Sequence, residues 1–138
     1  MKLHYDVEGG EFLNAGNASS AFKKVLKQVG IPSDIIRKVS VAMYEAEINM
    51  VIHADGGVIE AEISEKEIHV ILKDQGPGIP DVELAMKPGY STASKQAREM
   101  GFGAGMGLAN IKRYSDFLNI STIVGVGTTV EISFQLSS

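Results

Sequence analysis

Two segments of alternating hydrophobic residues stand on either side of a short polar turn, and they constrain the fold more than any other feature. The segments are IEAEI, residues 59–63, and IHVIL, residues 68–72. A period of two on both sides of a short turn predicts a β-hairpin. A hairpin in the middle of the chain argues against a fold built only from alternating parallel βαβ units.

The remaining periodicities predict a single domain over residues 1–138. We expect the following elements, in chain order: a strand over 3–7, a helix over 17–29, a second helix from Ser33 to about His53, the hairpin ending at Asp74, a long irregular segment from 75 to about 104, a third helix that includes Leu108 and Leu118, and two strands over 120–124 and 130–136, joined by a turn over 125–129. This order favours an α+β fold, a two-layer sandwich with a mixed, mostly antiparallel sheet and its helices on one face.

Composition excludes several classes of function. Lys and Arg total 13 against 17 Asp and Glu, for a net charge of -4, so no basic excess points to nucleic acid. The chain has no cysteine, and no apolar segment approaches the ~18 residues that a membrane span requires. No signal peptide is recognisable at the start, and the three histidines lack the spacing of a zinc site. We therefore expect a cytoplasmic protein that binds neither nucleic acid nor membrane.

A glycine run precedes the third helix. Gly101, Gly103, Gly105 and Gly107 alternate with larger residues, and the helical pattern begins immediately afterwards. Glycine is costly to order, so such a run indicates that a ligand approaches the backbone closely. The free N–H groups and the positive dipole end of a helix start favour an anion such as phosphate. The run lacks the GK[ST] of a P-loop, and its context is not that of a dinucleotide-binding fingerprint.

Three further motifs carry chemistry. Glu45 and Asn49 lie four apart on the second helix and therefore on one face, where they suit a hydroxyl and a magnesium ion. Asp74 ends an apolar strand, where a buried carboxylate needs a hydrogen-bond donor. It also begins the segment DQGPG, whose glycines let the backbone approach a flat ring. Thr128 lies in a GTT segment that precedes the last strand.

The order of these four motifs resembles the GHKL superfamily of Bergerat-fold ATP-binding proteins: ExxxN on a helix, DxGxG after a hairpin, a glycine run into a helix, and GT before the last strand. The resemblance covers residues 3–136. In its length, and in the segments GIPDVELAMKPGYST and GMGLANIKRYSD, the chain is most similar to bacterial anti-sigma-factor serine kinases and stressosome-type switch kinases.

The resemblance implies roles for residues in the four motifs. Glu45 would be the general base for a serine hydroxyl, and Asn49 would bind the Mg²⁺ that accompanies ATP. Asp74 would accept a hydrogen bond from the adenine amino group, with Thr128 acting through water, and Gly76 and Gly78 would line the adenine floor. The backbone N–H groups that would bind the phosphates belong to Gly101, Gly103, Gly105, Met106 and Gly107.

The same resemblance implies that residues 75–104 form an ATP lid. Members of the family often place an arginine where this chain has Gly103. Arg98 and Lys95 are the nearest cations, and Arg98 is the candidate for stabilising the transferred phosphoryl group.

The function implied is a Mg²⁺-ATP-dependent protein serine/threonine kinase of a bacterial partner-switching system. It would phosphorylate a small antagonist protein, and a sigma factor or a phosphatase is a further candidate partner. Two alternatives stay open: an ATP-gated partner-binding module with little or no kinase activity, and a domain that serves a histidine-containing partner in trans. Homodimerisation also stays open.

Two other polar residues of the second helix are given structural roles. Glu47 lies on a different side of the helix from Glu45, and we expect it to be solvated or paired. His53, one turn beyond Asn49, is expected to interact favourably with the helix C-terminus.

Overall fold

The computed structural model describes residues 1–8, 16–53, 56–74, 107–123 and 125–136. Its elements, in chain order, are β1 (Lys2–Glu8), α1 (Asn17–Gln28), α2 (Ser33–His53), β2 (Gly56–Ile63), β3 (Glu67–Asp74), α5 (Gly107–Tyr114), β4 (Phe117–Ile123) and β5 (Gly127–Gln135). None of the helices in this described part has the length and apolar character that crossing a membrane would require.

The strands form one five-stranded sheet in the order β1-β2-β3-β5-β4. The expected hairpin is present, with Ile59 opposite Leu72 in β2 and β3. All four neighbouring pairs of described strands are antiparallel. The expected mostly antiparallel sheet is therefore present, and no parallel pair occurs among the strands that the structure describes. β3 and β5 are distant in sequence but adjacent in the sheet, and Val70 lies opposite Ile132.

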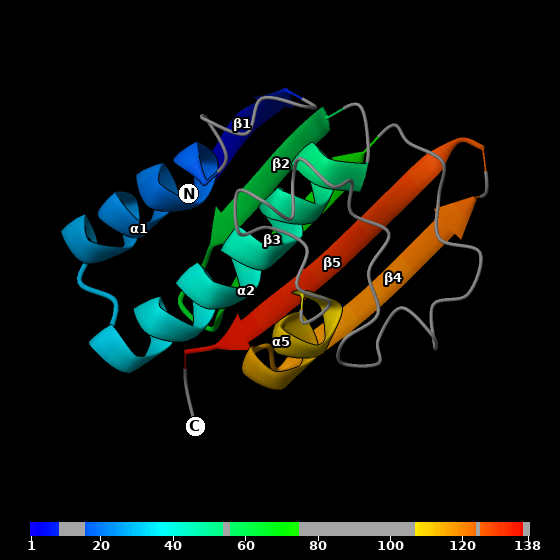
Figure 1. Ribbon diagram of the computed structural model, residues 1–138. Helices are drawn as coiled ribbons and strands as arrows, with labels where there is room; N and C mark the ends of the chain where they lie inside the picture. The colour runs from blue at the N-terminus through cyan, green and yellow to red at the C-terminus, as the bar shows by residue number, and fades with distance from the viewer. Residues whose placement is uncertain (9–15, 54–55, 75–106, 124, 137–138) are drawn as a thin grey trace.

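The expected two-layer α+β arrangement is confirmed. Helices α1, α2 and α5 lie on one face of the sheet (Figure 1). The hydrophobic residues of this helical layer and of the sheet face beneath it form one buried core, whose largest members include Phe22, Leu26, Met43, Ile59, Leu72, Ile132 and Phe134. Burial of such side chains is the main favourable contribution to folding.

The third helix is shorter than its hydrophobic pattern suggested. It ends at Tyr114, and Leu118 belongs to β4 instead of the helix. The segment between them turns into the sheet because Asp116 N–H donates to the Ser133 carbonyl, while the Asp116 carboxylate accepts from Gln135 N–H at 2.7 Å. These two bonds compete with continuation of the helix, and the helical spacing of Leu118 was coincidental.

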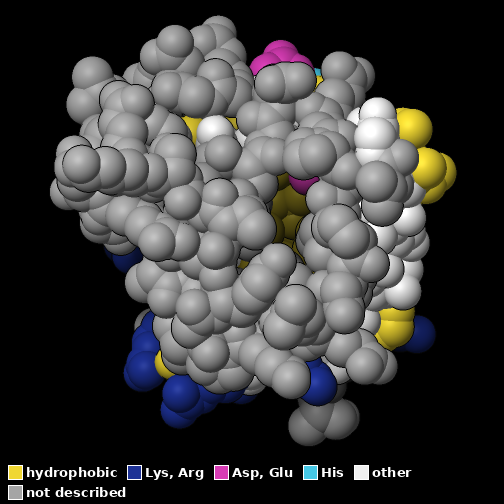
Figure 2. Space-filling model, turned by 45° about the vertical axis from the view of Figure 1, so that its right-hand side comes forward, with side chains coloured by type: hydrophobic (Ala, Val, Ile, Leu, Met, Phe, Trp, Pro, Cys, Tyr) yellow, Lys and Arg dark blue, Asp and Glu magenta, His cyan; other side chains and the backbone are white. Residues whose placement is uncertain are grey.

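β4 forms one edge of the described sheet and exposes large hydrophobic residues. Phe117 is 50% exposed, and Ile123 is 65% exposed at the other end of the strand. Figure 2, which brings this side of the molecule forward, shows hydrophobic side chains at its right-hand edge. The last strand begins at Gly127, earlier than expected, so Thr128 lies within β5.

Candidate functional site

The second half of α2 presents the predicted acidic and amide side chains on one face. Glu45 and Asn49 are both half-buried and lie one turn apart. Asn110 of α5 donates from Nδ2 to Glu45 Oε1 at 3.5 Å, a long hydrogen bond. The Glu45–Asn49 face therefore lies beside the helix that follows the glycine run.

The end of β3 and the start of β5 bring Asp74 and Thr128 together. The Thr128 N–H donates to Asp74 Oδ1 at 2.8 Å. Thr128 is buried, and its hydroxyl lies 3.1 Å from the Thr122 hydroxyl. No hydrogen-bond donor among the described residues reaches the other Asp74 oxygen, Oδ2.

Burial raises the pKa of the Asp74 carboxyl above its ordinary value, and the hydrogen bond from Thr128 N–H opposes that rise. Desolvation is the larger effect because it penalises the charged form of a half-buried carboxyl. Perturbed carboxyl groups of this kind are concentrated at binding sites. The predicted need of Asp74 for a donor is thus met in part by the protein backbone.

A glycine allows β5 to approach Asp74 closely. A Cβ atom at Gly127 would overlap the carbonyl oxygen of Asp74, which is backbone and cannot move aside. Gly127 therefore permits the contact that places the next residue, Thr128, on the Asp74 carboxylate.

Much of the predicted phosphate and lid machinery lies outside the described residues. This applies to Gly76, Gly78, Arg98, Gly101, Gly103, Gly105 and Met106, and to the whole of the predicted lid over 75–104. Gly107 is described and is the first residue of α5, so the predicted junction between the glycine run and a helix is present. His53 is the last residue of α2, as expected, but its side chain is outside the described part.

The sequence predicts that Glu47 is either solvated or paired. The structure shows that it is paired, with backbone N–H groups and one hydroxyl at the start of α1. Glu47 is 2% exposed. Its Oε2 accepts from the N–H groups of Gly16 and Ala18 at 2.9 and 3.2 Å, and its Oε1 accepts from the N–H and hydroxyl of Ser19 at 2.8 and 2.7 Å. Glu47 thus satisfies the free donors at the start of α1 from a neighbouring helix.

Gly16 makes this contact possible. It adopts a left-handed conformation, with φ of 92°, and a Cβ there would crowd the ring of Tyr44. Two acidic residues of α2, two positions apart, therefore have different partners: Glu45 faces α5 and Glu47 binds α1.

Asn110 was also missed by sequence reasoning. It lies one turn after Gly107, and the run GLAN at the start of the helix was interpreted only through its glycine and its apolar residues. The available signal was the position of Asn110 near the beginning of α5, because residues in the first turns of a helix lie near the groups that contact its N-terminus.

The oxygen donors on α2 fit a magnesium ion in chemical type. Mg²⁺ prefers oxygen ligands and is often held by one or two protein groups together with substrate phosphates. Among the described residues no group of three or more acidic or histidine side chains is placed to bind a metal by itself. A site of the kind predicted for Asn49, in which phosphates supply the other ligands, needs no such group.

Comparisons with known proteins agree with this arrangement. The family model described as "Histidine kinase-like ATPase domain" matches residues 13–134. The chain is 30% identical over 113 residues to a Bacillus subtilis protein named serine/threonine-protein kinase RsbT, with 79% of each chain covered. It is 34% identical over 125 residues to the anti-sigma F factor of Clostridium beijerinckii, covering 86% of this chain and 84% of the relative.

Solved structures share the fold. A Mycobacterium tuberculosis protein with RsbU and RsbW domains superposes with a TM-score of 0.68 at 18% identity, covering 100% of this chain and 33% of that one. The mycobacterial sensor histidine kinase MprB gives a TM-score of 0.55 at 18% identity, covering 98% of this chain and 97% of that one.

The chain belongs to the histidine kinase-like ATPase domain family. The predicted GHKL resemblance is confirmed, and the relatives carry the predicted names, a serine/threonine kinase and an anti-sigma factor. Membership of a family of ATPase domains makes ATP the expected ligand of this chain.

Proposed function

We propose that this chain is an ATP-dependent serine/threonine kinase of a partner-switching system, acting in the cytoplasm on a serine of a small antagonist protein. The observation that carries the proposal is the contact between Glu45 and Asn110. It sets a carboxylate and the Asn49 amide beside the beginning of α5, where a glycine run enters a helix. A base, a metal ligand and an anion-binding helix start therefore adjoin one another.

Asp74 is proposed to select the base of the nucleotide. Its Oδ1 is held by Thr128 N–H, and its Oδ2 is left to accept from the adenine amino group. Thr128 contributes its hydroxyl through a water molecule, and Gly76 and Gly78 line the face of the ring. The phosphates are proposed to bind backbone N–H groups of Gly101, Gly103, Gly105, Met106 and Gly107 under the lid over 75–104.

Glu45 is proposed to act as the general base. It accepts the proton of the serine hydroxyl as that oxygen bonds to the γ-phosphorus of ATP. The bond from the γ-phosphorus to the β,γ-bridging oxygen breaks, and ADP leaves. Asn49 would hold Mg²⁺, which would neutralise charge on the phosphate oxygens, and Arg98 is proposed to stabilise the transferred group.

A transfer assay tests this proposal. The protein is incubated with γ-labelled ATP and an extract of its source cells, and labelled products are tested for stability in acid. We expect an acid-stable phosphoserine, lost by Glu45→Gln although ATP binding persists. Glu62→Gln, on an exposed carboxylate of β2, is the matched control and should retain transfer.

Other results would overturn parts of the proposal. An acid-labile product would indicate transfer to histidine. Normal ATP binding without transfer in the unaltered protein would favour the second candidate function, an ATP-gated binding module. The observation that favours this candidate is Gly103, which stands where relatives often carry an arginine.

A further inference from the structure

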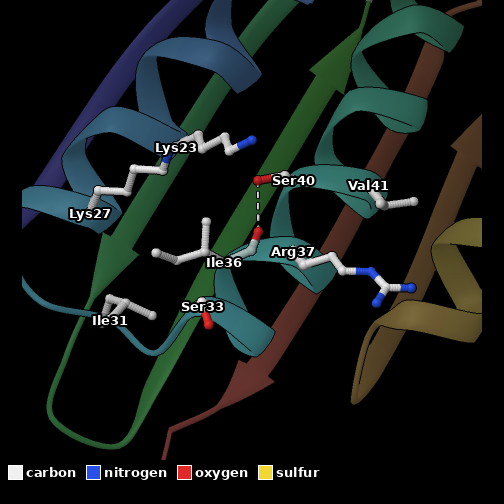
Figure 3. Close-up of a pocket in the computed structure, with 8 residues that line it drawn as sticks. All are labelled: Lys23, Lys27, Ile31, Ser33, Ile36, Arg37, Ser40 and Val41. Atoms are coloured by element: carbon white, nitrogen blue, oxygen red, sulfur yellow. Dashed lines mark hydrogen bonds between the residues drawn. The ribbon is translucent and has the colours of Figure 1, made fainter.

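A groove of about 530 Å³ lies between α1 and the beginning of α2. Its floor is apolar: Ile36 is 6% exposed, and Ile31 in the connection between the helices is half-buried. Lys23 and Lys27 of α1 line one side, and Arg37 of α2 lines the other (Figure 3). In this view Lys23 extends toward α2, whereas the Arg37 guanidinium extends away from α1. Positive charge therefore lies along the α1 side of an apolar floor, and Arg37 adds charge on the side of α2 that faces away from α1.

These cations have no acidic partner in the described part of the chain. Every ion pair found there has a histidine as its basic member. Figure 2 shows Lys and Arg side chains mainly in the lower part of the molecule, and acidic side chains at the top and in the central hollow. Because the chain as a whole carries a net charge of -4, this local excess of positive charge is not a consequence of composition.

We propose that this groove binds an acidic segment of the protein partner, with one apolar side chain of that segment against Ile31 and Ile36 and its carboxylates toward Lys23 and Lys27, within reach of Arg37 across α2. Two features select a polypeptide over an anionic membrane. The apolar floor is recessed between two helices, and the two lysines lie along one wall of that recess. A helix or extended segment with acidic residues around an apolar one matches both features.

The groove is separate from the proposed catalytic face. Arg37 and Glu45 are eight residues apart on α2, which corresponds to about 12 Å along the helix axis. A partner can therefore hold the groove with one segment while another segment carries its serine to Glu45. In taking the partner to be a protein, this inference rests on the proposed function, but the binding it predicts needs neither nucleotide nor phosphoryl transfer.

The test uses a labelled synthetic helix of Glu and Leu, with Leu spaced three and four apart, and a second peptide in which Lys replaces every Glu. Binding is measured by fluorescence polarisation without nucleotide. We expect the acidic peptide to bind with a Kd of about 10–100 µM and to weaken as salt is raised. The basic peptide should not bind.

Charge-reversed variants identify the surface. K23E/K27E/R37E should weaken binding of the acidic peptide at least tenfold. K24E/K38E/K112E makes the same change in net charge on exposed lysines that do not line the groove, and it should weaken binding less than threefold. Both variants are checked for unchanged thermal unfolding and unchanged ATP affinity, so failure of the groove is distinguished from failure of the nucleotide site.

Chemical-shift mapping on the unaltered protein provides an independent readout if a variant does not fold. Titration with the acidic peptide should shift the backbone amides of Ile31, Arg37 and Ser40. Equal binding by both peptides, equal losses in the two variants, shifts confined to other surfaces, or binding to anionic vesicles but not to the acidic peptide would each overturn the proposal.

Discussion

The backbone N–H of Thr128 donates a 2.8 Å hydrogen bond to the carboxylate of Asp74 and so joins the first residue pair beyond the paired ends of β3 and β5. A half-buried carboxylate at a strand end is costly unless hydrogen bonds compensate for its lost hydration. Here one carboxylate oxygen accepts a bond from the fold, and no donor in the described part of the chain reaches the other.

Asp74→Asn should lower ATP affinity by at least tenfold, because the amide replaces a charged acceptor by a neutral one that can also present its NH₂ group to the adenine. Its stability at neutral pH should equal or exceed that of the unaltered protein, since burial disfavours the charged carboxylate. Calorimetric titration with ATP and thermal unfolding measure the two effects.

Asp116→Asn is the matched control for that variant. Asp116 also accepts a hydrogen bond from a β5 backbone N–H, that of Gln135, but at the other end of the strand. We expect its ATP affinity to be unchanged. Loss of affinity in both variants would mean that the effect comes from general damage to β5.

ATP binding should weaken as the pH is lowered, beginning above the ordinary titration range of aspartate. Burial raises the pKa of Asp74, so the carboxyl is protonated sooner on acidification, and binding to the ionised form then requires loss of that proton. Well below the raised pKa the affinity should fall about tenfold per pH unit. A series of titrations from neutral to mildly acidic pH measures this.

Asp74→Asn also provides the control for the pH series. It cannot titrate at this position but retains every other source of pH dependence, including that of ATP itself. Its affinity should vary less over the same range. Parallel profiles for the two proteins would show that another group is responsible.

Gly127→Ala should reduce both stability and ATP affinity. The added Cβ overlaps the Asp74 carbonyl oxygen, so β5 must move away and Thr128 must leave the carboxylate. We expect a loss of about 1–3 kcal/mol in the free energy of unfolding.

Gly125→Ala is a close control. Gly125 has a positive φ of 82° but open space around it, so this variant should cost about 1–2 kcal/mol and leave ATP affinity intact. Urea unfolding and ATP titration of both variants separate local strain from damage to the site.

Glu47→Gln should lower the free energy of unfolding by about 2–3 kcal/mol, which corresponds to a fall in Tm of roughly 10 °C. The carboxylate accepts four hydrogen bonds at the start of α1. Glutamine offers only one carbonyl oxygen and turns an NH₂ donor toward other donors. Ser19→Ala, which removes only the hydroxyl donor, should cost about 1 kcal/mol. Equal effects of the two variants would contradict the role given to Glu47.

Local patterns predict most of the secondary structure because their physical causes are local. The alternation in residues 59–63 and 68–72 predicts two strands and their pairing, since a short turn leaves few other arrangements. The end of α5 was placed too late because Leu118 continues the helical spacing, and only hydrogen bonds to Ser133 and Gln135 reveal the turn at Asp116.

The sequence predicts the motifs of the candidate site better than it predicts the contacts between them. Glu45 and Asn49 share a helix, so their common face follows from spacing. The pairing of Asp74 with Thr128 and the contact of Glu47 with Ser19 join segments distant in sequence. Such contacts depend on sheet order and helix packing, on which the local pattern carries no information.

The separation of Asp74 and Thr128 has a consequence for the protein during its synthesis. They lie 54 positions apart, and the later one belongs to the last strand of the sheet. A nascent chain that has not yet released β5 from the ribosome has the carboxylate but lacks the backbone donor that orients it. With Asp74 in its proposed role, nucleotide binding by the emerging chain would require β5, and ATP would stabilise chains in which β5 has paired with β3.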